Sequence, residues 1–460
     1  MTTPLDGARV LVMGIGRRAG GVGVIRYALA TAAEVRVTDR GDPAAFAAVV
    51  EEFRDEPVAF VLGRHDEADF AWADVVVRNP DVRRDSPYLA VAEAHGARVE
   101  MEMTLFLAAS PAPTIGVTGT KGKTTTTLLL HAMLREHWPS SVVAGNMGRS
   151  ALARLGDVDA GVPVALELSS FQLEGLGEHA RSPHVAVITN LRPDHLDRYA
   201  SVAEYADAKA QIARHQGPDD WTVYPADDDA VGALVTGTRG RRVTFADGPH
   251  DGERTLFVLD GHFVAAWEGT RLDLGPVDAL TVPGAHNRRD ALAAAGAALA
   301  VGVTADEVRR GIAAFPGVPH RLERVATLDG VDYVNDSAAT TPDAAVAALE
   351  AFAGRPTVLI AGGFDKGLDL APLASAVTSH AAGVVLLDGT ATPPLAAALG
   401  PDVPVVGPVA SIADAVAAAA ALAPPGGVVL LSPGCASFGL FVDEFDRGDQ
   451  FRAAVQARRS

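Results

Sequence analysis

The sequence is poor in cysteine, in positive charge and in long apolar runs. Cys435 is the single cysteine among 460 residues, which excludes an intrachain disulfide and a zinc site built from several thiolates. Lys and Arg total 39 against 57 Asp and Glu, and the resulting net charge of −18 argues against nonspecific nucleic-acid binding and docking on anionic membranes. No apolar run reaches the ~18 residues of a membrane span, and the chain opens without a signal-peptide pattern. We therefore expect a soluble, cytoplasmic protein.

Short apolar runs alternate with longer alanine-rich stretches, which is typical of an α/β protein with parallel sheets. Apolar residues make up 48% of the sequence and charged residues 21%, as in ordinary globular domains. At roughly 150 residues per domain, the length predicts about three domains. Proline-containing links at 110–114 and 316–321 mark the expected boundaries, so the predicted domains are 1–111, 112–317 and 318–460.

A more polar, strand-like stretch lies near residues 240–282. Its short β-type runs are separated by turn residues instead of alanine-rich helices. We expect it to form a small antiparallel patch beside the main sheet.

The strongest motif is the glycine loop at residues 119–124, between a strand-like run and a helical stretch. Such a loop directs backbone N–H groups and a helix N-terminus at a phosphate chain. Lys123 adds a cation for the terminal phosphates, and the Thr124 hydroxyl can bind Mg²⁺. The loop departs from the standard P-loop because Val117 occupies the position of its first glycine. The motif predicts a phosphate-binding site, which the family resemblance described below assigns to ATP, formed by Gly119, Thr120, Lys121, Gly122, Lys123, Thr124 and Thr125.

Two further polar groups accompany the strands that follow this loop. Glu167 interrupts an apolar strand, where a buried carboxylate is costly unless it is paired or bound to metal. Asp194 and His195 follow the next strand, and functional groups of open α/β sheets gather at the carboxyl ends of strands. Lys209 lies in an amphipathic helical stretch, and taken alone it is typical of a solvated lysine.

A second glycine loop follows the first strand of the chain. Gly14, Gly16 and Gly20 approximate a dinucleotide fingerprint, with Asp39 as the acidic residue further on. The last glycine falls one position late, so the loop predicts a nucleotide or diphosphate site more firmly than an NAD site. A dinucleotide-dependent oxidoreductase stays open as an alternative.

With these residues in place, the chain resembles the Mur ligase family, and within it the glutamate-adding members. The resemblance covers nearly the full length in three blocks. Its central motifs are GVTGTKGKTT, GNMG, LELSSFQLE, NLRPDHLDRY, AKAQI and PGAHNRRDALAA, and its last block contains PHRLE, VNDSAATTP, GGFDKGLD and LSPGCASFGLF.

The resemblance implies three α/β domains. These are an N-terminal Rossmann-like unit for a UDP-linked substrate, a central P-loop-like ATPase unit with a mostly parallel sheet, and a C-terminal Rossmann-like unit for the amino acid. We expect the protein to be a monomer. The resemblance also implies a reaction of peptidoglycan synthesis. ATP phosphorylates the carboxylate of UDP-N-acetylmuramoyl-L-alanine, and the amine of glutamate attacks the acyl phosphate to give the amide, ADP and phosphate.

The same resemblance implies catalytic roles for Lys123, Glu167, His195 and Lys209. Thr124 and Glu167 match ligands of one Mg²⁺, and His195 matches a ligand of a second. Lys209 matches a lysine that CO₂ converts to a carbamate, which turns a cation into an anion able to organise the second metal site.

The remaining predicted contacts follow from the matching motifs. Gly14, Gly16, Asp39, Asn79 and Asn146 are expected to bind the UDP-linked substrate, with a metal-bound water as the alternative partner of Asn146. The other ATP contacts are His286 and Asn287 by the adenine, and Arg321 and Asp336 at phosphate and ribose. Thr340, Lys366, Ser437 and Phe445 match positions that hold the glutamate carboxylates.

The sequence departs from the family pattern at several positions. Ala338 replaces the usual lysine of the Asp-Ser-Lys-Ala-Thr motif, and Asp290 replaces an asparagine. The first glycine loop is more basic than usual, with Arg17 and Arg18. D-Glutamate is the favoured amino acid, L-glutamate followed by separate epimerisation is an alternative, and a nucleotide-binding regulatory paralogue is a remote one.

Overall fold

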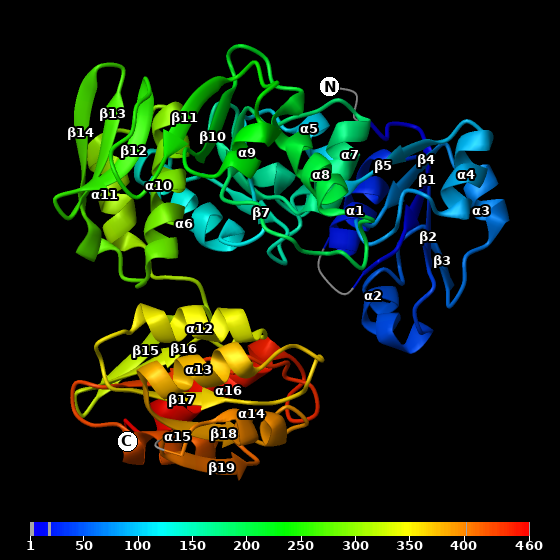
Figure 1. Ribbon diagram of the computed structural model, residues 1–460. Helices are drawn as coiled ribbons and strands as arrows, with labels where there is room; N and C mark the ends of the chain where they lie inside the picture. The colour runs from blue at the N-terminus through cyan, green and yellow to red at the C-terminus, as the bar shows by residue number, and fades with distance from the viewer. Residues whose placement is uncertain (1–3, 17–19, 402, 460) are drawn as a thin grey trace. The chain divides into compact units, whose positions relative to one another are not determined.

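The computed structural model describes residues 4–16, 20–401 and 403–459, and these form three helix-flanked β-sheets (Figure 1). The chain divides into two compact units, one of Met1–Ala279 with Arg289–Phe315 and one of Leu280–Arg288 with Pro316–Ser460. Two sheets belong to the first unit and one to the second. The predicted α/β class with three parallel-rich sheets is confirmed, whereas the individual domain limits stay predictions.

The first sheet has five parallel strands in the order β3-β2-β1-β4-β5. Their apolar side chains explain the buried faces, since four of the five residues of β1 and all four of β4 are buried. Because the order reverses between β1 and β4, a crevice is expected at their carboxyl ends. The elements are β1 (Arg9–Met13), α1 (Gly20–Thr31), β2 (Glu34–Asp39), η1 (Pro43–Phe46), α2 (Ala47–Glu52), β3 (Val58–Leu62), α3 (Glu67–Trp72), β4 (Val75–Arg78), α4 (Pro87–Ala94), β5 (Arg98–Glu100) and α5 (Glu102–Ala109).

The second sheet has nine strands in the order β14-β13-β12-β11-β10-β9-β6-β8-β7. Strand β6 lies between β9 and β8, so the loop that follows β6 is flanked by the ends of both neighbours. The elements are β6 (Thr114–Thr118), α6 (Lys123–His137), β7 (Val143–Gly145), η2 (Leu152–Asp157), β8 (Val164–Glu167), α7 (Ser170–Glu178), β9 (Val185–Ile188), α8 (Val202–Arg214), β10 (Trp221–Pro225), α9 (Asp229–Leu234), β11 (Arg241–Phe245), β12 (Arg254–Leu259), β13 (His262–Trp267), β14 (Thr270–Pro276), η3 (Val277–Ala279), α10 (Ala285–Ala300) and α11 (Ala305–Ala314).

The stretch 240–282 forms strands, and three of them pair antiparallel as predicted, but these strands continue the main sheet instead of lying beside it. Strand β11 pairs in parallel with β10, and β12 pairs in parallel with β11. Only β12, β13 and β14 are joined antiparallel. The stretch therefore extends the nine-stranded sheet at one edge.

The third sheet has six strands in the order β15-β16-β20-β17-β18-β19, with only β15 and β16 antiparallel. Helices α12 and α13 pack on one face, and α15 and α16 pack on the other (Figure 1). The elements are β15 (Glu323–Leu328), β16 (Val331–Asn335), α12 (Pro342–Ala351), β17 (Thr357–Ala361), α13 (Ala371–His380), β18 (Ala381–Leu387), α14 (Thr392–Ala398), β19 (Val405–Val409), α15 (Ile412–Leu422), β20 (Val428–Leu431) and α16 (Glu444–Ala457).

Among the described residues, no helix combines the length and the apolar character that crossing a membrane requires.

Candidate active site

The glycine loop after β6 has a backbone that only glycine adopts easily. Gly119 has φ +154° and Gly122 has φ +83°, and Gly122 is the N-cap residue of α6. A Cβ at Gly119 would lie 1.9 Å from Thr189 Oγ1, so the loop packs directly on the segment after β9. The Asn190 carbonyl and side chain accept hydrogen bonds from the N–H groups of Thr120 (3.1 Å) and Lys121 (3.0 Å). The first turn of α6, including the buried Thr125, follows immediately.

Two of the predicted lysines meet at one carbonyl of this loop. Lys123 Nζ donates to the carbonyl oxygens of Gly119 (2.9 Å) and Thr120 (3.0 Å). Lys209 Nζ donates to the same Gly119 oxygen at 2.9 Å, although Lys209 lies on α8. Lys209 is only 1% exposed, so the interpretation of Lys209 as a solvated lysine, based on its helical stretch alone, is wrong. Its pKa lies well below the ordinary value because burial, and then the nearby Lys123 charge, disfavour the ammonium form.

Glu167 lies at the end of β8 and is held by neutral groups. Its carboxylate accepts hydrogen bonds from Thr124 Oγ1 (2.6 Å) and Asn146 Nδ2 (3.1 Å), and the residue is 2% exposed. Neither partner carries a positive charge, so a bound cation would neutralise the negative charge of this buried carboxylate. Carboxylate and hydroxyl oxygens are ligands that Mg²⁺ accepts. Thr124 and Glu167 therefore fit the predicted metal site.

His195 reaches the same neighbourhood through aromatic contacts. Its backbone has φ +53°, and its N–H donates to Asp194 Oδ1 (3.0 Å). Its ring lies 5.1 Å from the Phe171 ring and 6.1 Å from the Tyr205 ring. The described residues contain no cluster of three or more His, Cys, Asp and Glu side chains arranged for a metal. A site at His195 accordingly needs ligands beyond these side chains.

Tyr205 connects these groups, and sequence reasoning missed it. The Tyr205 hydroxyl lies 3.2 Å from Thr120 Oγ1, and the Lys209 ammonium lies 4.7 Å from the centre of its ring. Burial raises the pKa of the Tyr205 phenol to about 12. Its spacing of four residues from Lys209 places both on one face of α8, which is the signal that could have revealed it. The structure thus brings Lys123, Glu167, His195 and Lys209 around one loop.

Asp290, one of the departures from the family pattern, lies beside this loop. A Cβ at Gly122 would lie 2.3 Å from Asp290 Oδ1, and Asp290 is 5% exposed. The structure therefore places a buried carboxyl group against the N-terminus of α6.

The predicted residues of the first sheet lie together at strand ends. Asp39 accepts hydrogen bonds from the N–H groups of Ile15 (2.8 Å) and Gly41 (2.7 Å), so its carboxylate holds two loops. Asn79 packs against the loop that contains Ile15, since Cβ atoms at Gly14 and Gly16 would lie 2.9 and 2.7 Å from its side chain. Arg17 and Arg18 lie outside the described residues.

The second unit carries its own groups of predicted residues. Asp336 is buried after β16 and accepts from Ser432 Oγ (2.7 Å) and Leu322 N–H (3.1 Å). Burial raises its pKa to about 7, against a smaller opposing effect of Ser432 and of Arg321. His286 and Asn287 lie in residues 280–288, which belong to this unit. Asn287 Nδ2 donates to the Pro283 carbonyl (2.6 Å).

Two of the predicted glutamate contacts share a small hollow in the second unit. Lys366 Nζ donates to Thr340 Oγ1 (3.3 Å), and both line the hollow together with Phe364, Asp365, Leu368, Leu370, Gly434 and Cys435. Ser437 is buried next to Ala436, which pairs with Phe364. Phe445 is half exposed and packs on the His320 ring at 5.7 Å, outside the residues that line this hollow.

A buried arginine contacts the segment in which Ala338 replaces the family lysine. Arg447 donates to Ser337 Oγ (2.9 Å) and to the Ser337 carbonyl (2.8 Å), and it has no exposed surface. Burial lowers its pKa to about 10. A cation is therefore present behind this segment although the lysine is absent.

The parallel sheets, the glycine loop on a helix N-terminus and the buried carboxylate are typical of α/β proteins that bind phosphates. Comparison with family models is specific: residues 117–298 match the Mur ligase middle domain, 320–435 the Mur ligase glutamate ligase domain, and 8–100 the Mur ligase MurD-like N-terminal domain. The chain belongs to the Mur ligase family. This family is ATP-dependent and generally uses Mg²⁺.

Similar proteins match along the whole chain. A UDP-N-acetylmuramoylalanine–D-glutamate ligase of Roseiflexus sp. is 48% identical, covering 98% of this chain and 99% of its own. Proteins of the same name from Geobacter metallireducens and Symbiobacterium thermophilum are 39% and 38% identical, with 98% of each chain covered.

Solved structures share the fold. The UDP-N-acetylmuramate–alanine ligase MurC of Thermotoga maritima has a TM-score of 0.61 at 22% identity, covering 98% of this chain and 100% of its own. MurF of Acinetobacter baumannii has a TM-score of 0.61 at 17% identity, with coverages of 98% and 91%.

Proposed function

We propose that the protein is an ATP-dependent ligase that joins D-glutamate to UDP-N-acetylmuramoyl-L-alanine in peptidoglycan synthesis. The observation that carries this proposal is the gathering of Lys123, Lys209 and the Thr124–Glu167 pair around one phosphate loop. Relatives that carry this ligase name, with 48%, 39% and 38% identity over nearly the whole chain, support it. The matching N-terminal model at 8–100 favours a UDP-substrate domain over a dinucleotide oxidoreductase.

The first step brings two anions together. A carboxylate oxygen of the substrate attacks the γ-phosphorus of ATP, the new O–P bond forms, and the bond to the leaving oxygen of ADP breaks. Lys123 and the loop N–H groups would neutralise the charge that builds on the phosphoryl oxygens. Lys123 now donates to carbonyl oxygens of the loop, so it has to exchange these partners for phosphate oxygens.

Mg²⁺ would be held by Thr124 and Glu167, and by His195 at a second position, and it would supply further charge neutralisation. The low pKa of Lys209 makes its neutral amine available for reaction with CO₂. The nitrogen forms a bond to the CO₂ carbon and releases a proton, which leaves a carbamate anion. This anion would supply the additional ligand that the second position needs.

The second step joins the amino acid. The neutral amine of glutamate attacks the acyl carbon and forms the C–N bond. The tetrahedral intermediate then collapses as the C–O bond to phosphate breaks and the nitrogen releases one proton, which gives amide and phosphate. Lys366 and Thr340 offer a cation and a hydroxyl for a glutamate carboxylate, with Ser437 and Phe445 as further contacts. Arg321, Asp336, His286 and Asn287 would contact ATP, and Gly14, Gly16, Asp39, Asn79 and Asn146 the UDP-linked substrate.

One assay tests this function directly. Purified protein with Mg²⁺, ATP and UDP-N-acetylmuramoyl-L-alanine should release ADP when D-glutamate is added, and much more slowly with L-glutamate. Turnover with L-glutamate alone would identify the epimerisation-dependent variant. Nucleotide binding without any turnover would instead identify a regulatory paralogue.

A further inference from the structure

The turn that carries Arg321 has a strained backbone. His320 has φ +61° and Leu322 has φ +44°, so two non-glycine residues on either side of Arg321 adopt the left-handed conformation. Such residues cost free energy and persist only where surrounding contacts force them. The contacts that force this turn should therefore also fix the position of the Arg321 side chain.

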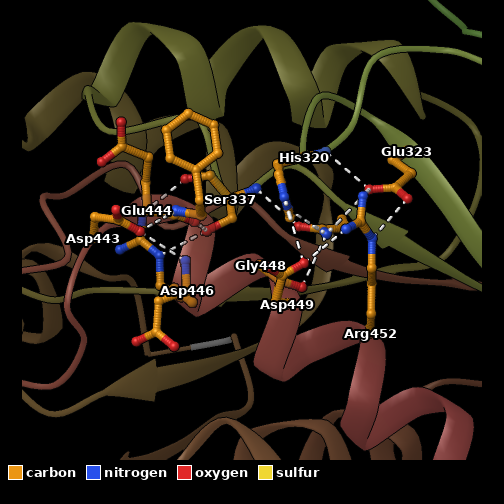
Figure 2. Close-up of polar contacts among 12 residues, drawn as sticks. His320, Glu323, Ser337, Asp443, Glu444, Asp446, Gly448, Asp449 and Arg452 are labelled. Atoms are coloured by element: carbon orange, nitrogen blue, oxygen red, sulfur yellow. Dashed lines mark hydrogen bonds and ion pairs between the residues drawn. The ribbon is translucent and has the colours of Figure 1, made fainter. Parts of the chain in front are cut away.

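One carboxylate holds the turn from behind. Glu323 Oε2 accepts a hydrogen bond from the His320 N–H (2.9 Å) and lies 3.3 Å from Asn335 Nδ2. Arg452 of α16 donates two hydrogen bonds to the same carboxylate, from Nε to Oε1 (2.9 Å) and from Nη2 to Oε2 (2.8 Å). Figure 2 shows this bidentate pair next to His320. Both side chains are about three-quarters buried, with 27% and 21% exposed.

The His320 ring is held by Asn335 of β16 and packs closely against α16. Its Nδ1 accepts a hydrogen bond from Asn335 Nδ2 (3.0 Å), and Asn335 Nδ2 also donates to the Gly448 carbonyl (3.1 Å). A Cβ at Gly448 would lie 2.0 Å from His320 Nδ1, so α16 approaches this closely only because residue 448 is glycine. The turn is also tied to Asp336 through the Leu322 N–H (3.1 Å).

We propose that Arg452 and Glu323 are positioning residues, which hold the turn so that Arg321 and Asp336 present their side chains to the nucleotide. This rests on the proposed function, in which Arg321 and Asp336 contact ATP. The competing explanation is an ordinary ion pair that fastens α16 to the sheet. The two explanations differ in whether nucleotide affinity or only stability changes when the pair is broken.

The test compares Arg452→Gln, Glu323→Gln and the double variant in the full-length enzyme. The matched control is Arg355→Gln, which breaks a comparable pair with Asp332 (2.8 Å, 38% and 16% exposed) at the opposite end of β16. The measurements are the Kd for ATP by calorimetry, KM for ATP and kcat, and thermal unfolding. Arg452→Lys is included as a milder variant that keeps the charge but loses the two-pronged geometry.

We expect Arg452→Gln and Glu323→Gln to weaken ATP binding about 10-fold, with kcat changed much less. The double variant should bind ATP no more weakly than the single variant with the lower affinity, because both substitutions remove the same contact. Arg452→Lys should lie between, and Arg355→Gln should match the wild type. In an Arg321→Ala background, Arg452→Gln should add only a small further loss of ATP affinity, the part that acts through Asp336.

Several results would overturn the proposal. Unchanged ATP affinity in folded Arg452→Gln and Arg452→Lys, with only a lower unfolding temperature, would leave a purely structural pair. A full additional loss in the Arg321→Ala background would show that the pair does not act through Arg321. In both cases wild-type ligation would continue, whereas a wild type that binds no ATP would overturn the proposed function together with this inference.

Discussion

Lysine usage is the residue-scale feature that most clearly marks the site. The chain contains only four lysines, Lys121, Lys123, Lys209 and Lys366, so the other 35 of its 39 basic residues are arginine. All four lysines are predicted site residues, and two of them share the Gly119 carbonyl. Arginine does not lose a proton in proteins, whereas a buried lysine readily does. This count was available in the sequence, although the burial of Lys209 was not, because helix α8 alone does not reveal what covers it.

Lys209→Arg tests whether the amine itself is needed. A guanidinium keeps a positive charge but stays protonated and does not form a carbamate with CO₂. We expect turnover to fall at least ~100-fold, in line with the loss of a charge-stabilising group. The measurement is ADP release with all substrates, together with carbon-13 NMR of protein equilibrated with labelled bicarbonate, where a carbamate signal should vanish in the variant. Near-normal turnover of Lys209→Arg would contradict the carbamate proposal.

Asp336→Asn tests the buried carboxyl of the second unit. Burial raises the pKa of Asp336 from 3.8 to about 7, so between these values the folded protein keeps a proton that the unfolded chain releases. The contribution of this group to the free energy of unfolding is therefore largest below pH 3.8. It falls by about 1.4 kcal/mol per pH unit as the pH rises from 3.8 to about 7. Asparagine retains the shape without the charge.

We accordingly expect the two proteins to be similarly stable at pH 4 and the variant to be about 4 kcal/mol more stable at pH 8. Urea unfolding without ligands across this range measures the difference. A difference that does not change with pH would show that Asp336 titrates normally. The variant should also lose ATP affinity, which would show that the buried charge serves binding at the expense of stability.

At the scale of elements, the glycine loop was predictable because its motif is local. The strand, the loop and helix α6 are consecutive, and each is specified by its own residues. The strands of the stretch 240–282 were also predicted from local patterns, but their membership of the nine-stranded sheet was not. Local patterns specify strands, but the pairing of β11 with β10 depends on a partner whose identity the pattern does not contain.

Gly122→Ala tests the geometry of this loop. The residue has φ +83°, and a Cβ would lie 2.3 Å from Asp290 Oδ1, so both backbone and packing oppose a side chain. We expect a loss of about 1–3 kcal/mol in the free energy of unfolding and a clear loss of ATP affinity. The control is Gly232→Ala in α9, where nothing lies within 4 Å of the added Cβ, and stability should rise or stay unchanged. Equal behaviour of both variants in thermal unfolding and ATP binding would contradict this account.

At the scale of the whole molecule, the net charge of −18 contrasts with the cations held at the phosphate loop. Composition predicted the acidic surface, and the motifs predicted the local cations. The division of the chain was less accessible, because residues 280–288 associate with the second unit although residues 289–315 belong to the first. That exchange occurs between Arg288 and Arg289 within helix α10, and neither proline nor glycine stands at that point to mark it.

In the proposed reaction, the γ-phosphoryl group of ATP moves to a carboxylate at the groups around the phosphate loop. UDP-N-acetylmuramoyl-L-alanine labelled with oxygen-18 in its carboxylate tests it, because the oxygen that attacks phosphorus leaves with the phosphate. With ATP, Mg²⁺ and D-glutamate, phosphorus-31 NMR should show one labelled oxygen in each inorganic phosphate, and Lys123→Ala should slow its appearance at least ~100-fold. Unlabelled phosphate from a turning-over enzyme, or full activity of Lys123→Ala, would contradict the account.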